Sequence, residues 1–216
     1  MKLFNSYIIL LVFTIVLSGC VAPNVNTQDK FLSAAPRSIL VVPVVNKSVE
    51  VTAADYMLST VSIPLAERGF YVFPINLVKR VLEDDGLADS SMVHAAPASK
   101  LASLFGADAV LYINIERWDA QYMFLTTTVT VALDYEIRDG KTDEVLWQNK
   151  AKMVYQPDGG GGGGIGGLIA KVVVAAITKA APNYMPLAHQ ANAAALYRYS
   201  GPGIPFGPYK IKEKPL

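Results

Sequence analysis

The stretch that decides the fold is Ala109–Trp118, AVLYINIERW, in which apolar and polar side chains alternate as they do along a half-buried strand. Two more β-rich stretches follow it, Tyr122–Arg138 and Val145–Tyr155. Between these two lies Asp139–Thr142, DGKT, a turn sequence of the kind that joins hairpin strands. The three stretches therefore predict an antiparallel meander.

The segment before the meander begins with a strand and a helix. Ser38–Val45 (SILVVPVV) is a β-branched run typical of a buried strand, in which Pro43 indicates an edge position or a bulge. Ala53–Arg68 has apolar residues at helical spacing. Pro64 should bend this helix or begin a second short one, and Gly69 should terminate it.

Three shorter elements complete this half of the domain. Phe70–Ile75 (FYVFPI) predicts a second strand, and Asn76–Glu83 predicts a helix capped by Asn76. After a polar loop, Pro97–Phe105 predicts a third helix that ends at Gly106. The order of the elements predicts an α+β fold, a mixed sheet with helices packed on it.

The N-terminus has the features of a secretory signal peptide. A basic head at Met1–Lys2 precedes the apolar run Tyr7–Leu17, which small residues follow before a cut. The run is shorter than the ~20 apolar residues that a stable membrane-spanning helix needs. We therefore expect residues 1–19 to be removed on export.

Leu17-Ser18-Gly19-Cys20 has the form of a lipobox. Cys20 is the only cysteine, and we expect its thiol to receive a diacylglycerol and its freed amine a further acyl chain such as palmitate. Two or three chains anchor a protein stably where a single one does not. The alternative is an uncleaved anchor with an incidental cysteine. Val21 replaces the Asp that retains many lipoproteins at the inner membrane, which favours the outer membrane.

Charge and cysteine content limit the kinds of partner and chemistry that the mature chain can have. Removing the signal peptide takes Lys2, one of 19 basic residues, and none of the 18 acidic ones, so the mature chain would be formally neutral. It lacks the positive excess typical of nucleic-acid binding. With Cys20 lipidated, no thiol remains for a disulfide or a redox role, so packing must hold the fold.

Shifts in composition divide the chain. The expected parts are a signal peptide (1–19), a polar lipidated tether (20–36), the α+β domain (37–158), a Gly-rich loop (159–167), C-terminal helices (168–199) and a Gly/Pro-rich tail (200–216). The C-terminal helices are Leu168–Ala181, ended by Pro182, and Asn183–Tyr199, capped by Asn183.

Several stretches resemble a family of bacterial lipoproteins of unknown function that includes a meningococcal surface-antigen lipoprotein. These stretches are Pro64–Pro74 (PLAERGFYVFP), Phe105–Tyr112 (FGADAVLY), Trp118, Leu146-Trp147 and Gly207-Pro208-Tyr209. Such proteins are similar to the N-terminal domain of TolB and to the core of the curli-secretion lipoprotein CsgG. The resemblance implies a periplasm-facing domain, a homodimer and work beside a CsgG-like envelope lipoprotein. It implies no reaction and no catalytic residue.

The glycine run has the spacing of a dinucleotide fingerprint at Gly162, Gly164 and Gly167. The fingerprint also needs an acidic residue about 20 positions later to hold the ribose. After Asp158 the next acidic residue is Glu213, and no Gly-Lys-Ser/Thr of a phosphate-binding loop is present. A flexible connector is the favoured interpretation, so we expect no cofactor.

The segment after the glycines is a candidate interaction helix. Ile165–Ala181 is made almost wholly of apolar and small residues, and the candidate contact residues are Ile165, Leu168, Val172 and Ile177. Such a helix could dock in a partner's groove, pair with its copy in a dimer or touch the membrane. Ordinary packing over the sheet is the alternative.

Other candidate sites are weaker. His94 and His189 are the only histidines, so a zinc site would need carboxylates from scattered positions, and no Gly-x-Ser-x-Gly elbow is present. Asp84 and Asp85 are adjacent, and adjacent residues do not face each other on a helix. We therefore expect no metal site and no catalytic residues.

Five aromatic residues of the meander could line a ligand-binding face if their strands expose them together: Trp118, Tyr122, Tyr135, Trp147 and Tyr155. Aromatic residues in strands more often pack in the core. The sequence thus favours a non-enzymatic lipoprotein, anchored at the outer membrane and facing the periplasm, that assists envelope assembly or secretion through protein–protein contacts. The alternative is a small-ligand or peptidoglycan-binding module.

Overall fold

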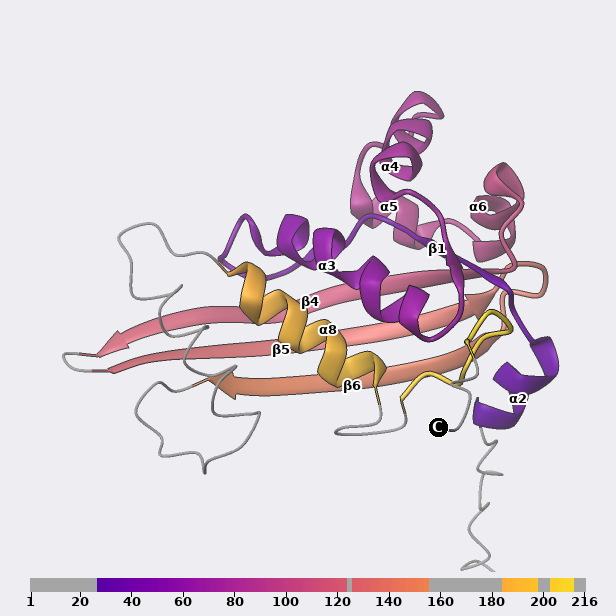
Figure 1. Ribbon diagram of the computed structural model, residues 1–216. Helices are drawn as coiled ribbons and strands as arrows, with labels where there is room; N and C mark the ends of the chain where they lie inside the picture. The colour runs from indigo at the N-terminus through magenta and orange to yellow at the C-terminus, as the bar shows by residue number, and fades with distance from the viewer. Residues whose placement is uncertain (1–26, 124–125, 156–183, 198–202, 212–216) are drawn as a thin grey trace, which may run out of the picture.

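The computed structural model describes residues 27–123, 126–155, 184–197 and 203–211. Within them a six-stranded sheet has the order β3-β1-β4-β5-β6, with β2 paired to β4 (Figure 1). The strands are β1 (Ser38–Val41), β2 (Val45–Asn46), β3 (Tyr71–Val72), β4 (Ala109–Met123), β5 (Thr126–Asp139) and β6 (Val145–Tyr155). The helices are α2 (Thr27–Ala34), α3 (Ala53–Glu67), α4 (Ile75–Asp84), α5 (Ser90–Ala95), α6 (Ala98–Phe105) and α8 (Met185–Leu196). In this part of the chain, no helix has the length and hydropathy to cross a membrane.

The sheet is mixed, as predicted. Strand β1 runs parallel to both of its neighbours, β3 and β4. Strands β4, β5 and β6 form the predicted antiparallel meander, and β6 has the predicted bounds. The α+β fold class is therefore confirmed.

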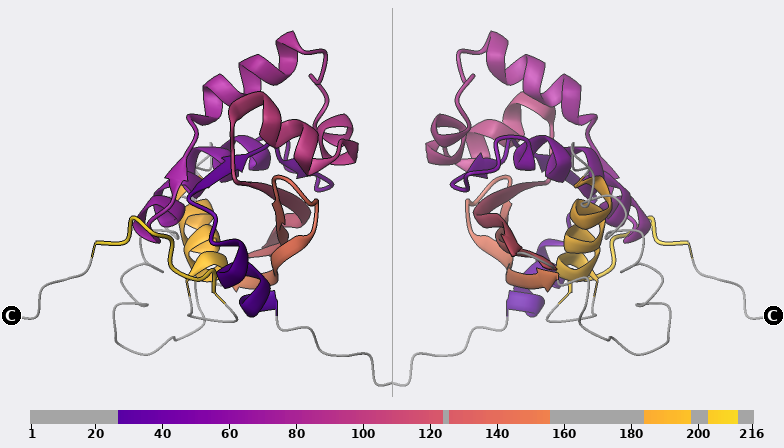
Figure 2. Two further views of the ribbon diagram at one scale, coloured as in Figure 1. Left: turned by 90° about the vertical axis from the view of Figure 1, so that its right-hand side faces the viewer. Right: turned by 90° about the vertical axis from the view of Figure 1, so that its left-hand side faces the viewer.

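Helices cover the two faces of the sheet unequally (Figures 1 and 2). On one face α2, α3 and α8 pack against the long strands around a large apolar core that includes Phe31, Met57 and Leu187. On the other face α4, α5 and α6 form a smaller core with Leu40 and Val110, close to β1. The rest of this second face, over β5 and β6, has no helix of the described chain on it (Figure 1).

Two glycines end helices as the sequence predicts. Gly69 has a φ of +90°, and the amides of Gly69 and Phe70 turn back to the carbonyls of Ala66 and Leu65. Gly106 ends α6 with a φ of +70°. Of the two effects predicted for Pro64, the start of a second helix is excluded, because α3 continues past Pro64 to Glu67.

Several local predictions are corrected by the structure. The predicted strand Ser38–Val45 is broken into β1 and β2 around Pro43, and helix α5 occupies part of the expected polar loop. Residues 27–34 of the expected tether form helix α2. The caps also differ, since Pro74 precedes α4 in place of Asn76, and Tyr184 precedes α8 in place of Asn183.

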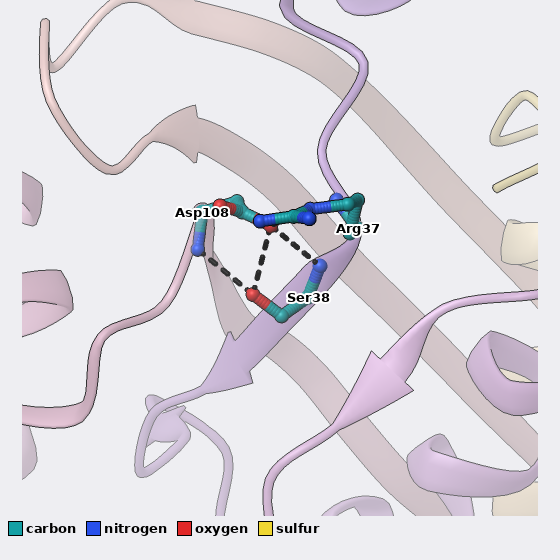
Figure 3. A network of polar contacts seen from close by, with 3 residues as sticks. All are labelled: Arg37, Ser38 and Asp108. Carbon is teal, nitrogen blue, oxygen red and sulfur yellow. Dashed lines mark hydrogen bonds and ion pairs between the residues drawn. The ribbon is translucent and has the colours of Figure 1, made fainter. Parts of the chain in front are cut away.

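Asp108 joins the beginnings of β1 and β4 (Figure 3). Its Oδ2 accepts hydrogen bonds from the amides of Arg37 and Ser38 at 3.0 and 3.1 Å, and from the Ser38 hydroxyl at 3.1 Å. The Asp108 amide donates in return to Ser38 Oγ at 2.9 Å. One carboxylate thus sets the start of two neighbouring strands.

The described part of the C-terminal tail packs on the end of α3. The amide of Gly207 donates to the carbonyl of Arg68 at 2.8 Å, and that of Tyr209 donates to the carbonyl of Gly69 at 3.0 Å. Ile204 is buried in the main core. Residues 203–211 therefore form no regular element, as predicted, yet they belong to the folded domain.

Candidate functional site

The uncovered end of the second sheet face carries two rows of polar side chains. Strand register aligns Tyr112 with Glu136 and Gln148, and Asn114 with Asp134 and Lys150. Successive side chains of a strand point to opposite faces, so the residues between them enter the main core. These core residues are Leu111, Ile113, Leu133, Tyr135, Ile137 and Trp147.

A depression of about 400 Å³ lies over these rows. The two rows form its floor, together with Arg138, and His94 of α5 forms one wall. Tyr135 and Asn149 also border it, but their side chains bind Asn192 and the Ala195 carbonyl on the other face. The volume lies in the range of about 300–1,000 Å³ that ligand pockets occupy.

The charges in the depression compensate each other. Glu136 pairs with Arg138 at 2.6 Å, and Asp134 pairs with Lys150 at 3.1 Å. The hydrogen bond to Glu136 raises the pKa of Arg138. Each pair is partly exposed, so we assign it little stabilising energy. Each pair places a carboxylate, which accepts hydrogen bonds, beside a cationic group, which donates them.

His94 is held as a neutral imidazole. Its Nε2 lies 2.9 Å from the Pro43 carbonyl, and its ring meets the Tyr112 ring edge-on with centroids 5.1 Å apart. Burial lowers the pKa of His94, against the opposing effects of the Pro43 carbonyl and the Glu136 carboxylate. Because a carbonyl can only accept, Nε2 carries the proton. The side chain of Asn114 is a further hydrogen-bond partner of the ring.

Tyr112 is the least satisfied polar group of the site. The residue is 5% exposed, and its hydroxyl has no hydrogen-bond partner among the residues that the structure describes. Burial raises the pKa of Tyr112 to about 12, although Arg138, whose guanidinium lies 5.8 Å from the ring centroid, opposes the shift. The phenol therefore stays protonated at neutral pH, with a donor and an acceptor unused.

The chemistry available here is hydrogen bonding. Carboxylates, amides, a phenol and a neutral imidazole line the depression. Across the described ranges, no group of three or more His, Cys, Asp or Glu side chains is placed to hold a metal ion. The arrangement suits recognition of a polar molecule or a polar protein surface.

Several predicted site residues lie outside the described residues. These are Cys20, the glycine run and the candidate interaction helix with Ile165, Leu168, Val172 and Ile177. Lipidation at Cys20 and contacts made by this helix therefore stay predictions.

The predicted aromatic face is not formed as such. Trp118, Tyr135 and Trp147 are buried in the main core. The side chains of Tyr122 and Tyr155 lie outside the description. His189 is exposed on α8, far along the chain from His94 in the depression. Sequence reasoning missed Tyr112, Asn114, Glu136, Gln148 and the other floor residues, although their alternation with core residues was a usable signal.

Comparisons with known proteins connect the chain to lipoproteins. The family model described as "Putative lipoprotein GNA1162-like" matches residues 28–209. The curated "Putative lipoprotein NMB1124/NMB1162" of Neisseria meningitidis serogroup B is 31% identical over 205 residues, which cover 92% of this chain and 94% of that protein. The crystal structure of lipoprotein GNA1162 from Neisseria meningitidis is 33% identical, with a TM-score of 0.56, over 65% of this chain and 96% of that one.

Proposed function

Because this chain belongs to the GNA1162-like family of lipoproteins, we propose that it is a non-enzymatic accessory protein of envelope assembly or secretion that works through protein–protein contacts. Family membership agrees with the resemblance that the sequence indicates, and it implies a membrane-anchored place in the cell envelope. The finer proposal is an outer-membrane anchor at Cys20 and a domain that faces the periplasm. The absence of Asp after Cys20 supports this choice of membrane.

The observation that carries the proposal is the uncovered polar face of β5 and β6. Its long strands are backed by the main core, and it carries two pairs of acidic and basic side chains, Glu136 with Arg138 and Asp134 with Lys150. Such a surface favours a partner with complementary charges, which gives specificity more than raw affinity. A second copy of the chain or a CsgG-like envelope lipoprotein is the proposed partner.

Site-specific photo-crosslinking in cells tests this proposal. A crosslinking amino acid at Gln148, exposed on the floor of the depression, should capture an envelope protein or a second copy. The matched control is the same amino acid at Glu83, exposed on α4, which packs beside β1. Cys20→Ala should move the protein out of the membrane fraction and abolish the product. Equal capture from both positions, or from neither, would contradict the proposal.

Binding of a small ligand is the second candidate function. The depression between α5 and the meander, with its unpaired Tyr112 hydroxyl, is the observation that favours it. The site for it differs from the predicted aromatic face, since the described aromatic side chains of that face are buried.

A further inference from the structure

The Tyr112 hydroxyl is buried at the border of the depression and has no hydrogen-bond partner among the described residues. A buried hydroxyl without a partner costs about 1–3 kcal/mol, so native proteins rarely keep one without a reason. Tyr112 lines the depression, beside His94 and Glu136. A ligand that hydrogen-bonds to this hydroxyl would remove the cost.

The charges of the floor select the kind of ligand. Two carboxylates and two cations are paired there, and His94 is neutral, so the formal charge of the lining is zero. An anion or a cation would meet a like-charged group in either pair. The lining therefore favours an uncharged molecule.

The pairs also suit hydroxyl groups in particular. A hydroxyl both donates and accepts, and the pairs Glu136–Arg138 and Asp134–Lys150 each place an acceptor beside a donor. The amides of Asn114 and Gln148 do the same within single side chains. The lining residues are all of polar or charged types or carry a polar group, and polar atoms supply more of the exposed lining than apolar atoms do, which suits hydroxyl groups better than the hydrophobic side chains of a peptide.

From these observations we propose that the depression between α5 and the meander binds a neutral saccharide. The inference rests on the second candidate function, ligand binding. It uses the same rows of β5 and β6 as the protein contacts proposed first, and the two proposals are tested by separate measurements. Tyr112, Glu136 and Gln148 form the row that contacts the sugar hydroxyls.

Calorimetric titration of the full-length lipoprotein tests the proposal, in a detergent without sugar headgroups. The probe is the neutral tetrasaccharide of N-acetylglucosamine, and its deacetylated, cationic counterpart is the matched control. We expect the neutral probe to bind with a Kd of about 1 mM or tighter, and the cationic probe to bind roughly tenfold more weakly. Neutral maltotetraose shows whether the acetamido groups matter.

Variants locate the binding site. Glu136→Gln and Gln148→Ala should weaken binding about fivefold or more. Tyr112→Phe should weaken binding while the melting temperature stays equal or rises, because the hydroxyl has no partner without ligand. A merely structural hydroxyl would lower the melting temperature instead. Glu116→Gln, which alters a carboxylate paired with Lys47 outside the depression, should bind as the wild type does.

Two sources of saccharide are separated by a sedimentation assay. If the protein pellets with purified peptidoglycan sacculi and the soluble tetrasaccharide prevents this, the saccharide comes from the cell-wall glycan. If the protein binds the soluble probes but does not pellet with sacculi, the saccharide is a free oligosaccharide. The proposal is overturned if no neutral saccharide binds at about 10 mM, tenfold above a 1 mM Kd. It is also overturned if only charged probes bind, or if Gln148→Ala and Glu136→Gln leave binding unchanged. Crosslinking from Gln148 is a separate readout, so either proposal can fail alone.

Discussion

The Tyr135 hydroxyl donates a hydrogen bond to Asn192 Oδ1 at 2.9 Å, and both residues are buried. The Asn192 amide donates in turn to the Met57 carbonyl at 3.2 Å and to Thr60 Oγ1 at 2.8 Å. One side chain of α8 is thereby bonded to the sheet and to α3. A buried network of this kind stabilises a fold when every member is satisfied, and it fixes how the helices sit on the sheet.

Asn192→Leu should lower the free energy of unfolding by about 2–3 kcal/mol, because it leaves the Tyr135 hydroxyl buried without a partner. Urea unfolding followed by circular dichroism measures the change. His189→Ala, at an exposed position of the same helix, is the control and should change stability by less than about 0.5 kcal/mol. Similar effects of the two variants would show that the network contributes nothing.

Asp108→Ala should also destabilise the fold, by about 2 kcal/mol, since the amides of Arg37 and Ser38 lose their acceptor. Asp108→Asn keeps one acceptor oxygen and should cost about half as much. Hydrogen exchange of the Ser38 amide reports the local effect. Unchanged exchange in Asp108→Ala would contradict the role assigned to this carboxylate.

The fold could be predicted where local signals and tertiary packing agree. The meander was visible because its alternation continues over whole strands, and Gly69 ends α3 because only the left-handed conformation fits there. Helix α2 was missed because its stabilisation is tertiary: its sequence is polar, and Phe31 is the residue that it buries in the main core. Helix α5 was missed because it has only 6 residues.

Stability should fall in mildly acidic solution because of His94. Its pKa is lowered in the folded state, so below pH 6.5 the unfolded chain takes up a proton that the folded one resists. Stability is therefore full above about pH 6.5 and decreases as the pH falls toward the folded pKa. Glu136, Lys47 and Asn114 face the ring and modulate the shift.

Urea unfolding of the wild type and of His94→Gln at pH 7.5 and pH 5 isolates this contribution. The wild type should lose more stability between the two pH values than the variant, since the other titrating groups are common to both. A larger loss of stability in His94→Gln than in the wild type would contradict the lowered pKa assigned to His94 in the folded state.

Gly207→Ala should detach the C-terminal tail from α3. A Cβ at this position would lie 2.3 Å from the Gly69 carbonyl oxygen and 2.7 Å from the Phe70 ring, and relieving the clash should cost about 1–3 kcal/mol. The amides of Gly207 and Tyr209 should then exchange faster. Gly86→Ala is the control: no atom lies within 4 Å of the added carbon, and the φ of +81° strains an alanine locally, so this variant should leave the two tail amides protected.

Deleting residues 159–181 tests the candidate interaction helix. If that segment serves self-association, the variant should remain folded and lipidated but elute as a smaller species in size-exclusion chromatography with light scattering. An insoluble or unfolded product would instead support ordinary packing of the segment over the sheet.

The candidate site was harder to predict than the fold. Tyr112, Glu136 and Gln148 are separated by long stretches of sequence, and only strand register brings them into one row. Burial of Tyr112 beneath Arg138 and beside His94 depends on where α5 packs, which no local pattern specifies. The sequence therefore favoured a site made of large aromatic residues, and the structure places three of them, Trp118, Tyr135 and Trp147, in the core.

The hydrogen bonds from Gly207 and Tyr209 to the end of α3 also determine when the domain can finish folding. The acceptors, the carbonyls of Arg68 and Gly69, precede the donors by a long stretch of sequence. These pairs can therefore form only after Gly207 and Tyr209 have left the ribosome. Such late closure would suit the export signal that the sequence predicts at residues 1–19, because a polypeptide that finishes folding late can still be moved unfolded across a membrane.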